Sequence, residues 1–382
     1  MRAYLDHAST TPLRPGVLDE MVPWMSSADP GRVHTEGRMA RVALEEARHE
    51  VALAFATRPR QVVFTSGATE AINAAVHGAV RSAVLAGRGD HVIVSEVEHL
   101  AVREASARSA GRLTWVGADG KGTIRPDEVL GAIGADTALV HCQWANQEVG
   151  TLQPVTEIVA ACREQGVTVH VDAASAGGRV PIAFDELGAD LMSVSAHKLG
   201  GPRGVGALLV RRGRRFSPLV LGGAQERARR AGMEDVAGAV GFAAALRHLG
   251  AIHDGRTRLA LEAGIARSQI SALRGAALAH AGVVGIGPSD PAEALPNLLC
   301  LDVDGVEAEG VLLGLDQAGV AAHSGSSCSS ELLEPSPVLA AMGVPAERSL
   351  RFSVGWPTTD AEVALAGRVL PEVIGRLRAL GG

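Results

Sequence analysis

The stretch from Thr168 to Lys198 reads TVHVDAASAGGRVPIAFDELGADLMSVSAHK, and it carries the pattern that decides the fold. Two short runs in it, Thr168–Asp172 and Leu191–Ser195, are rich in β-branched and apolar residues and end in a polar residue. Runs that are apolar at both odd and even positions are typical of strands buried on both faces of a sheet. In parallel sheets the carboxyl ends of such strands face the ligand crevice, so we expect functional residues directly after both runs.

The same pattern continues on both sides of this stretch. Further strand-like runs occur at Val62–Thr65, His91–Ser95, Ala138–Gln143 and Gly206–Val210, and helical patterns such as Arg38–Ala56 and Thr156–Gln165 lie between them. Strands that alternate with helices predict an α/β fold with a mainly parallel central sheet.

The pattern changes after about Gly250. A long helical stretch leads to a strand-like run at Asn297–Val303, a helix at Glu307–Ala318 and another strand-like run at Ser349–Ser353. We therefore expect a large domain at residues 13–250 and a smaller α+β domain formed by residues 1–12 and 251–382. Pockets often form where two domains meet, so we expect the functional site there.

Composition excludes several classes of protein. The net charge is -6, which argues against a nucleic-acid partner. The four cysteines have no CxxC spacing, so we expect neither a metal site nor a disulfide framework. The longest apolar stretch, Val236–Leu246, is too short to span a bilayer. With no signal peptide in the sequence, we expect a soluble cytoplasmic protein with reduced thiols.

Lysine is rare in this chain. Of 36 basic residues only Lys121 and Lys198 are lysines. An amine can be deprotonated and can form a Schiff base, which a guanidinium cannot, so a retained lysine is a candidate for that chemistry. Lys121 lies in the turn-like sequence Asp-Gly-Lys-Gly, whereas Lys198 follows a predicted strand and is the stronger candidate.

Other polar residues follow the predicted strands. Thr65–Glu70 has small residues at the start of a helix, which favours either an anion or a simple N-cap. Asp172 could pair with a protonated ring nitrogen or cap a turn. Ser195 and His197 could donate to a phosphate. His99 could stack on an aromatic cofactor and move protons, although a lone histidine is more often a surface or core residue.

Three more residues are candidates. Asn146, like a lone histidine, could be either a functional residue or an ordinary surface or core residue. Cys328 lies in a Ser/Gly-rich segment with few apolar residues, which suits either an exposed nucleophile or a harmless surface cysteine. Arg351 is a charge within a strand-like run, which suits either a bidentate carboxylate contact or a solvent-facing edge.

Taken in order, the motifs resemble one family. The matching segments are Tyr4–Pro12, Phe64–Glu70, Glu98-His99, Asn146–Gly150, His170–Ala173, Ser195–Lys198, Gly201–Gly206, Gly222-Gly223, Ser324–Cys328, Leu333–Ser336 and Arg351–Ser353. The chain resembles the NifS-like cysteine desulfurases, which belong to the fold-type I enzymes that use pyridoxal 5'-phosphate (PLP). The resemblance implies conversion of L-cysteine to L-alanine in a homodimer, with sulfur passed to an acceptor protein for iron–sulfur clusters or another pathway.

The resemblance also implies roles for individual residues. Lys198 would hold the cofactor aldehyde and take the Cα proton, and Cys328 would receive the sulfur as a persulfide. Arg351 would bind the substrate carboxylate. The remaining contacts would come from Asp172 at the ring nitrogen, His99 on the ring face, Asn146 at the phenolic oxygen or the substrate, and Ala68, Thr69, Ser195 and His197 at the phosphate.

The chain departs from the family pattern at several of these positions. Ser175 stands where the family usually has a glutamine and is too short for the same reach. Met233 stands where the family has a threonine that reaches the neighbouring subunit's phosphate. Unlike threonine, methionine cannot donate a hydrogen bond. Gln147 replaces the second asparagine of Asn-Asn-Glu, and Ala196 replaces the glycine before His-Lys.

Two kinds of alternative stay open. A selenocysteine lyase, a cysteine sulfinate desulfinase or an aminotransferase of the same fold needs Lys198 and Asp172 but no loop thiol, so Cys328 favours the desulfurase. A non-catalytic scaffold protein that binds a partner would not need the combination of Lys198, Asp172, His99 and Arg351.

Overall fold

The structure, a computed structural model, describes residues 2–324 and 335–381. Its larger lobe is built on a seven-stranded sheet with the order β2-β8-β7-β6-β5-β3-β4. The strands are β2 (Val62–Thr65), β3 (His91–Ser95), β4 (Arg112–Val116), β5 (Thr137–Gln143), β6 (Val169–Asp172), β7 (Leu191–Ser195) and β8 (Gly206–Val210). Only β8 runs antiparallel to its neighbours β2 and β7. The predicted α/β class with a mainly parallel sheet is therefore confirmed.

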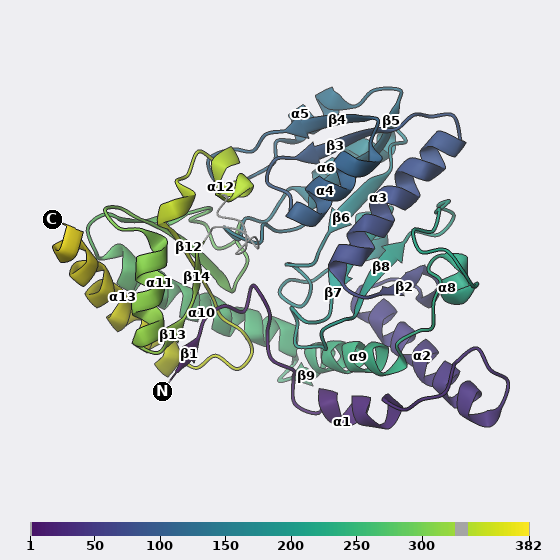
Figure 1. The fold of residues 1–382 in the computed structure, drawn as a ribbon, viewed down its shortest axis with the longest axis horizontal. Coiled ribbons are helices and arrows are strands. Elements are labelled where there is room, and N and C mark those ends of the chain that lie inside the picture. The colour runs from purple at the N-terminus through teal and green to yellow at the C-terminus, as the bar shows by residue number, and fades with distance from the viewer. Residues whose placement is uncertain (1, 325–334, 382) are drawn as a thin grey trace.

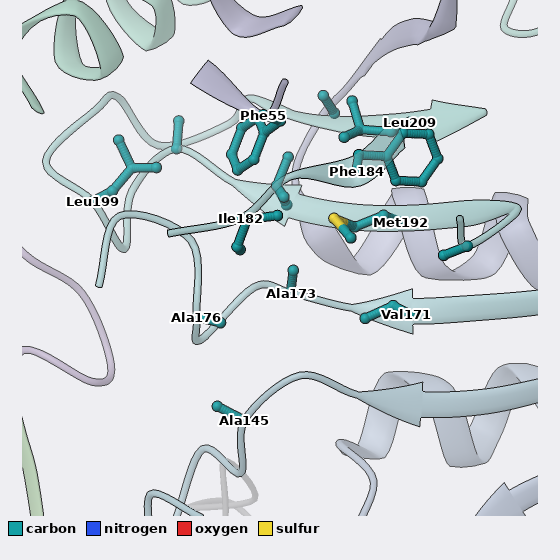
Figure 2. Close-up of a cluster of buried hydrophobic side chains, with 14 of the residues drawn as sticks. Phe55, Ala145, Val171, Ala173, Ala176, Ile182, Phe184, Met192, Leu199 and Leu209 are labelled. Carbon is teal, nitrogen blue, oxygen red and sulfur yellow. The ribbon is translucent and has the colours of Figure 1, made fainter. Parts of the chain in front are cut away.

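Helices cover both faces of this sheet (Figure 1). They are α2 (Thr35–Ala54), α3 (Ala68–Leu85), α4 (Leu100–Ser109), α6 (Val155–Glu164) and α9 (Val236–Gly250). Alternate strand residues pack into two cores, so that Ile93 joins α2, α6 and α9 on one face while Val92 and Val94 join α3 and α4 on the other. Figure 2 shows part of the first core, which includes Phe55, Phe184 and Met192.

The smaller lobe is built on a four-stranded antiparallel sheet with the order β11-β12-β15-β14. Its strands are β11 (Val283–Ile286), β12 (Leu298–Val303), β14 (His323–Ser324) and β15 (Ser349–Ser353), and its helices are α10 (Arg258–Leu278), α11 (Ala308–Gln317) and α13 (Asp360–Gly381). The N-terminal strand β1 (Ala3–Tyr4) pairs in parallel with β13 (Val320–Ala321), so the first residues of the chain pack in this lobe.

Short elements connect these parts. They are α1 (Val17–Met21), η1 (Val22–Trp24), η2 (Pro59–Gln61), α5 (Pro126–Ala132), α7 (Phe184–Leu187), α8 (Gln225–Ala228), β9 (Ile252–His253), β10 (Arg256–Thr257), α12 (Pro337–Ala341) and η3 (Ala346–Arg348). Although α12 is late in the chain, its Val338 and Leu339 are buried in the core that α2, α6 and α9 share. Within residues 2–324 and 335–381, no helix is both long and apolar enough to cross a membrane.

Candidate active site

A cavity of about 660 Å³ lies at the carboxyl ends of β6 and β7. Its walls come from both lobes, because Arg351 of β15 and His323 of β14 face it together with the residues that follow the strands of the large sheet. The cavity brings together nine of the residues predicted from sequence: Ala68, Thr69, His99, Asp172, Ser175, Ser195, His197, Lys198 and Arg351.

Lys198 and Asp172 are placed by neighbouring parallel strands. Asp172 ends β6, and its Oδ1 accepts hydrogen bonds from the Ser193 hydroxyl at 2.9 Å and from the Ala174 N–H at 3.0 Å. Lys198 follows β7, and its Nζ donates to the Ser175 hydroxyl at 3.3 Å. The carboxylate is thus held in one orientation at the cavity wall, within the same pocket as the amine.

His99 begins helix α4. Its Nδ1 accepts a hydrogen bond from the Ala101 N–H at 3.0 Å, so in the neutral ring the proton is on Nε2. Burial, followed by the nearby charge of Lys198, lowers the pKa of His99, while Asp172 acts in the opposite direction. The ring is therefore a neutral, flat wall of the cavity with a fixed tautomer.

A second group of residues at the cavity suits an anion. Helix α3 begins at Ala68, and the first N–H groups of a helix have no partner within it. The Ser195 hydroxyl is buried and has no hydrogen-bond partner among the described residues. Arg203 also lines the cavity and adds a positive charge. A Cβ at Gly206 would lie 2.6 Å from the Val194 carbonyl oxygen, so only glycine lets β8 pack this closely there.

His197 also lines the cavity. Its Nδ1 is 3.2 Å from the Thr10 hydroxyl. Burial lowers the pKa of His197 to about 4, and the charges of Lys198 and Arg203 act in the same direction. The ring is therefore neutral near pH 7, and it contributes a hydrogen bond rather than a charge.

Arg351 is buried, lines the cavity and has one side-chain N–H group without a partner among the described residues. Its Nη1 donates to the Gln147 carbonyl at 3.1 Å and its Nη2 to Asp6 at 3.0 Å. Its Nε is buried and has no hydrogen-bond partner in the described part of the chain. An unpaired buried guanidinium N–H costs free energy, so this edge suits a carboxylate. His323 lies opposite Arg351 in the β14–β15 pair, and burial, then Arg351, lowers its pKa.

Asn146 was expected to contact the phenolic oxygen or the substrate, but it is not among the residues that line the cavity. Its side chain is buried and donates to the Val97 carbonyl at 3.1 Å, while its Oδ1 accepts from the N–H groups of Glu148 and Val149. Its neighbour Gln147 lines the cavity. Asn146 therefore holds the turn that follows β5, and Gln147 is the residue of that motif at the cavity wall.

Cys328 lies outside the described residues. The other three cysteines are buried, and burial raises the pKa of each thiol, most clearly for Cys142. Sequence reasoning assigned no role to Asp6, Gln147, Arg203 or His323, all of which lie at the cavity or on Arg351. Three of them could have been found, because Asp6, Gln147 and Arg203 fall within the motifs that carried the resemblance.

Comparison with known proteins agrees with this geometry. The model of the aminotransferase class-V family matches residues 3–365. The chain belongs to the class-V aminotransferase family. Among curated proteins, the cysteine desulfurase IscS of Dictyoglomus turgidum is 38% identical over 391 residues, which cover 99% of this chain and 95% of that protein. The resemblance to the NifS-like cysteine desulfurases is therefore confirmed.

Comparison with solved structures gives the same result. A NifS-like protein superposes with a TM-score of 0.89 at 30% identity and covers 99% of this chain and 100% of its own. SspA in complex with cysteine superposes with a TM-score of 0.79 at 28% identity, and the match covers 94% of this chain and 100% of SspA. The family of this chain depends on PLP.

Proposed function

We propose that this protein is a PLP-dependent cysteine desulfurase, which converts L-cysteine to L-alanine and passes the sulfur through Cys328 to an acceptor protein. The observation that supports it most is the single cavity that gathers Lys198, Asp172, His99 and Arg351 around an anion site. A curated relative that covers nearly the whole chain bears the same name.

The residues present fit PLP. The N-terminus of α3 with the Ser195 hydroxyl would hold the phosphate, since both offer hydrogen-bond donors without partners of their own. Asp172 would pair with the protonated ring nitrogen, and His99 would lie on the ring face. When bound, PLP supplies an electron sink for charge that develops at the substrate Cα.

The chain's own groups would then do the positioning and the proton transfer. The free edge of Arg351 would hold the substrate carboxylate, with Asp6 keeping the guanidinium in place. Nζ of Lys198 would accept the Cα proton. The Cys328 thiolate would attack the substrate sulfur, so that one sulfur atom leaves cysteine, alanine remains, and Cys328 becomes a persulfide with no external oxidant required.

The proposal also covers the location, the oligomeric state and the domain organisation of the protein. The protein would act as a cytoplasmic homodimer, with residues 13–250 as the PLP-binding domain and residues 1–12 and 251–382 as the domain that carries Cys328. Met233 is 69% exposed in the single chain, as expected of a residue near a neighbouring subunit. Sedimentation should therefore show a dimer, and Met233→Thr should tighten PLP binding; a stable, active monomer would contradict this arrangement.

The decisive experiment concerns Cys328. Cys328→Ala should keep the yellow colour of bound PLP and still change its spectrum with L-cysteine, but it should release no sulfide. Mass spectrometry of wild-type protein after L-cysteine should place the additional sulfur on Cys328, and Cys162→Ala, which removes a buried thiol, should leave this unchanged. Alanine formation by Cys328→Ala at the wild-type rate would reject the proposal in favour of a lyase or an aminotransferase.

A further inference from the structure

The turn that carries Lys198 is held from outside at four consecutive carbonyls. Thr11 N–H donates to the His197 oxygen at 3.1 Å, Arg179 Nη2 to the Lys198 oxygen at 3.0 Å, Arg14 Nε to the Leu199 oxygen at 2.7 Å and Arg14 N–H to the Gly200 oxygen at 2.9 Å. Two of these bonds come from guanidinium groups. A carbonyl needs no charge to be satisfied, so the use of two arginines here calls for a physical reason.

Both arginines are buried at a cost. Arg14 is 2% exposed and Arg179 is 8% exposed. Burial lowers the pKa of Arg179 to about 10, and the charge of Arg14 acts in the same direction. Among the described residues, Glu262 is the carboxylate that compensates them, and it takes Arg14 in a bidentate pair at 2.7 Å and 2.7 Å. Desolvating guanidinium groups is expensive, whereas the fork geometry of arginine fixes direction.

Each arginine connects the lysine turn to a different part of the molecule. Arg179 ends the segment that follows β6, which also carries Ser175, the hydroxyl partner of Lys198 Nζ. Arg14 reaches through Glu262 to helix α10 of the smaller lobe. Space around the turn is tight, since a Cβ at Gly178 would lie 2.5 Å from the Leu199 Cβ. The backbone of Lys198 is therefore tied to both lobes.

We propose that Arg14 and Arg179 are positioning residues for Lys198, and that the Arg14–Glu262 pair makes the position of the lysine depend on helix α10. The inference rests on the proposed role of Lys198 as the residue that binds PLP covalently. Neither arginine touches the cofactor site itself, because neither lines the cavity. Their effect would pass through the backbone of residues 198 and 199.

The test separates placement of the lysine from binding of the cofactor. Apo-protein is mixed with PLP, and absorbance follows formation of the carbon–nitrogen double bond between Nζ and the aldehyde carbon, which releases one water. Pyridoxamine phosphate serves as the second probe, because it offers similar ring and phosphate contacts but has no aldehyde. A displacement of about 1 Å can cost roughly 100-fold in rate, so we expect bond formation to slow tenfold or more in Arg14→Lys and Glu262→Gln.

The Kd of pyridoxamine phosphate should stay unchanged in both variants. Arg14→Lys keeps the charge but loses the fork, and Glu262→Gln removes the carboxylate from the other side of the pair. Arg348→Lys is the matched control, since Arg348 makes a bidentate pair with Asp302 within the smaller lobe. It should alter neither the rate nor the Kd.

The possible results are distinct. A rate that stays at the wild-type value in both variants overturns the positioning role. If bond formation with PLP slows and the Kd of pyridoxamine phosphate rises together, the variants have lost structure, and the positioning role is overturned as well. The proposed function fails if wild-type protein does not form the carbon–nitrogen bond with PLP, or if Lys198→Ala still forms it. The inference then fails as well.

Discussion

Asp6 and Arg351 are 345 positions apart in sequence, yet Oδ1 of Asp6 accepts a hydrogen bond from Nη2 of Arg351 at 3.0 Å. The contact exists because the N-terminal segment pairs with β13 and bridges to Ser353 beside Arg351. Asp6 occupies one side of the guanidinium and the Gln147 carbonyl another, while Nε has no partner among the described residues. A substrate carboxylate would meet a cation that is already oriented.

Arg351→Ala should raise the KM for L-cysteine about tenfold or more, because a bidentate charge-assisted contact is worth about 1.5–3 kcal/mol. Asp6→Asn should raise it by a smaller factor, since the amide oxygen can still accept from Arg351 but carries no charge. Steady-state kinetics measure both. Asp316→Asn, which breaks an exposed pair with Arg2, is the control that should have no effect. An unchanged KM in Arg351→Ala would move the carboxylate site elsewhere.

Lys198→Ala should lose the visible absorbance of covalently bound PLP and should give no borohydride-reducible adduct. The reason is that only a deprotonated amine at this position can reach the cofactor from the end of β7. Lys121→Ala is the matched control, because Lys121 is exposed and pairs with Glu293 at 3.1 Å. A reducible adduct that persists in Lys198→Ala would show that another amine holds the cofactor.

Asp172→Ala should lower both PLP retention and turnover by tenfold or more. A hydrogen bond to a charged group is typically worth about 1.5–3 kcal/mol, and without the carboxylate the ring nitrogen loses its proton and the electron sink weakens. Ser193→Ala should have a smaller effect in the same direction, since the Ser193 hydroxyl only orients Oδ1. Dialysis followed by absorbance measures retention. Wild-type turnover in Asp172→Ala would assign the ring contact to a different group.

Stability should fall as pH rises through the titration of Glu148. Burial raises the pKa of this carboxyl from 4.5 to about 7, and the hydrogen bond from Ser336 at 2.5 Å only partly opposes the shift. Because the folded pKa is the higher one, its contribution to stability is complete below pH 4.5 and is lost as pH rises through about 7. The loss would be roughly 3 kcal/mol at most.

Urea unfolding at about pH 5 and about pH 8 tests the effect of Glu148. Glu148→Gln should lose less stability than wild type between the two values, because the amide stays neutral at both. Glu157→Gln makes the same change in charge at an exposed position of α6 and should follow the wild-type curve. Parallel curves for wild type and Glu148→Gln would contradict the prediction.

Local pattern was a good guide to the large sheet. All six predicted strands are present, each within one residue at either end, because strands that are buried on both faces of a sheet are apolar at odd and even positions alike. Edge strand β4 was not predicted, since the charged Arg112 and the polar Thr114 interrupt its apolar residues. Helix α2 begins at Thr35, three residues before the expected start, because His34 caps it by accepting from the Gly37 N–H.

In the candidate site, too, some residues could be predicted from the sequence and others were placed only by the structure. Lys198, Asp172, His99 and Ser195 were predicted because each ends a strand or lies in the loop after one, and parallel strands bring such positions to one edge. Asn146 and Gln147 occupy adjacent positions of one turn, and the sequence could not show which side chain faces the cavity. The hydrogen bonds of Asn146 to Val97, Glu148 and Val149 decided that.

By itself, the sequence determined the α/β class, the family and the residues that follow the strands, because hydrophobic periodicity and short motifs are local properties of a chain. The tertiary structure alone decided which distant groups meet: Asp6 with Arg351, and Arg14 with Leu199 and Glu262. These partners lie 345, 185 and 248 positions apart, and no local pattern encodes a contact over such a separation. They meet because burial of the two lobes' apolar faces brings the N-terminal segment against both lobes, where polar groups without water must pair with each other.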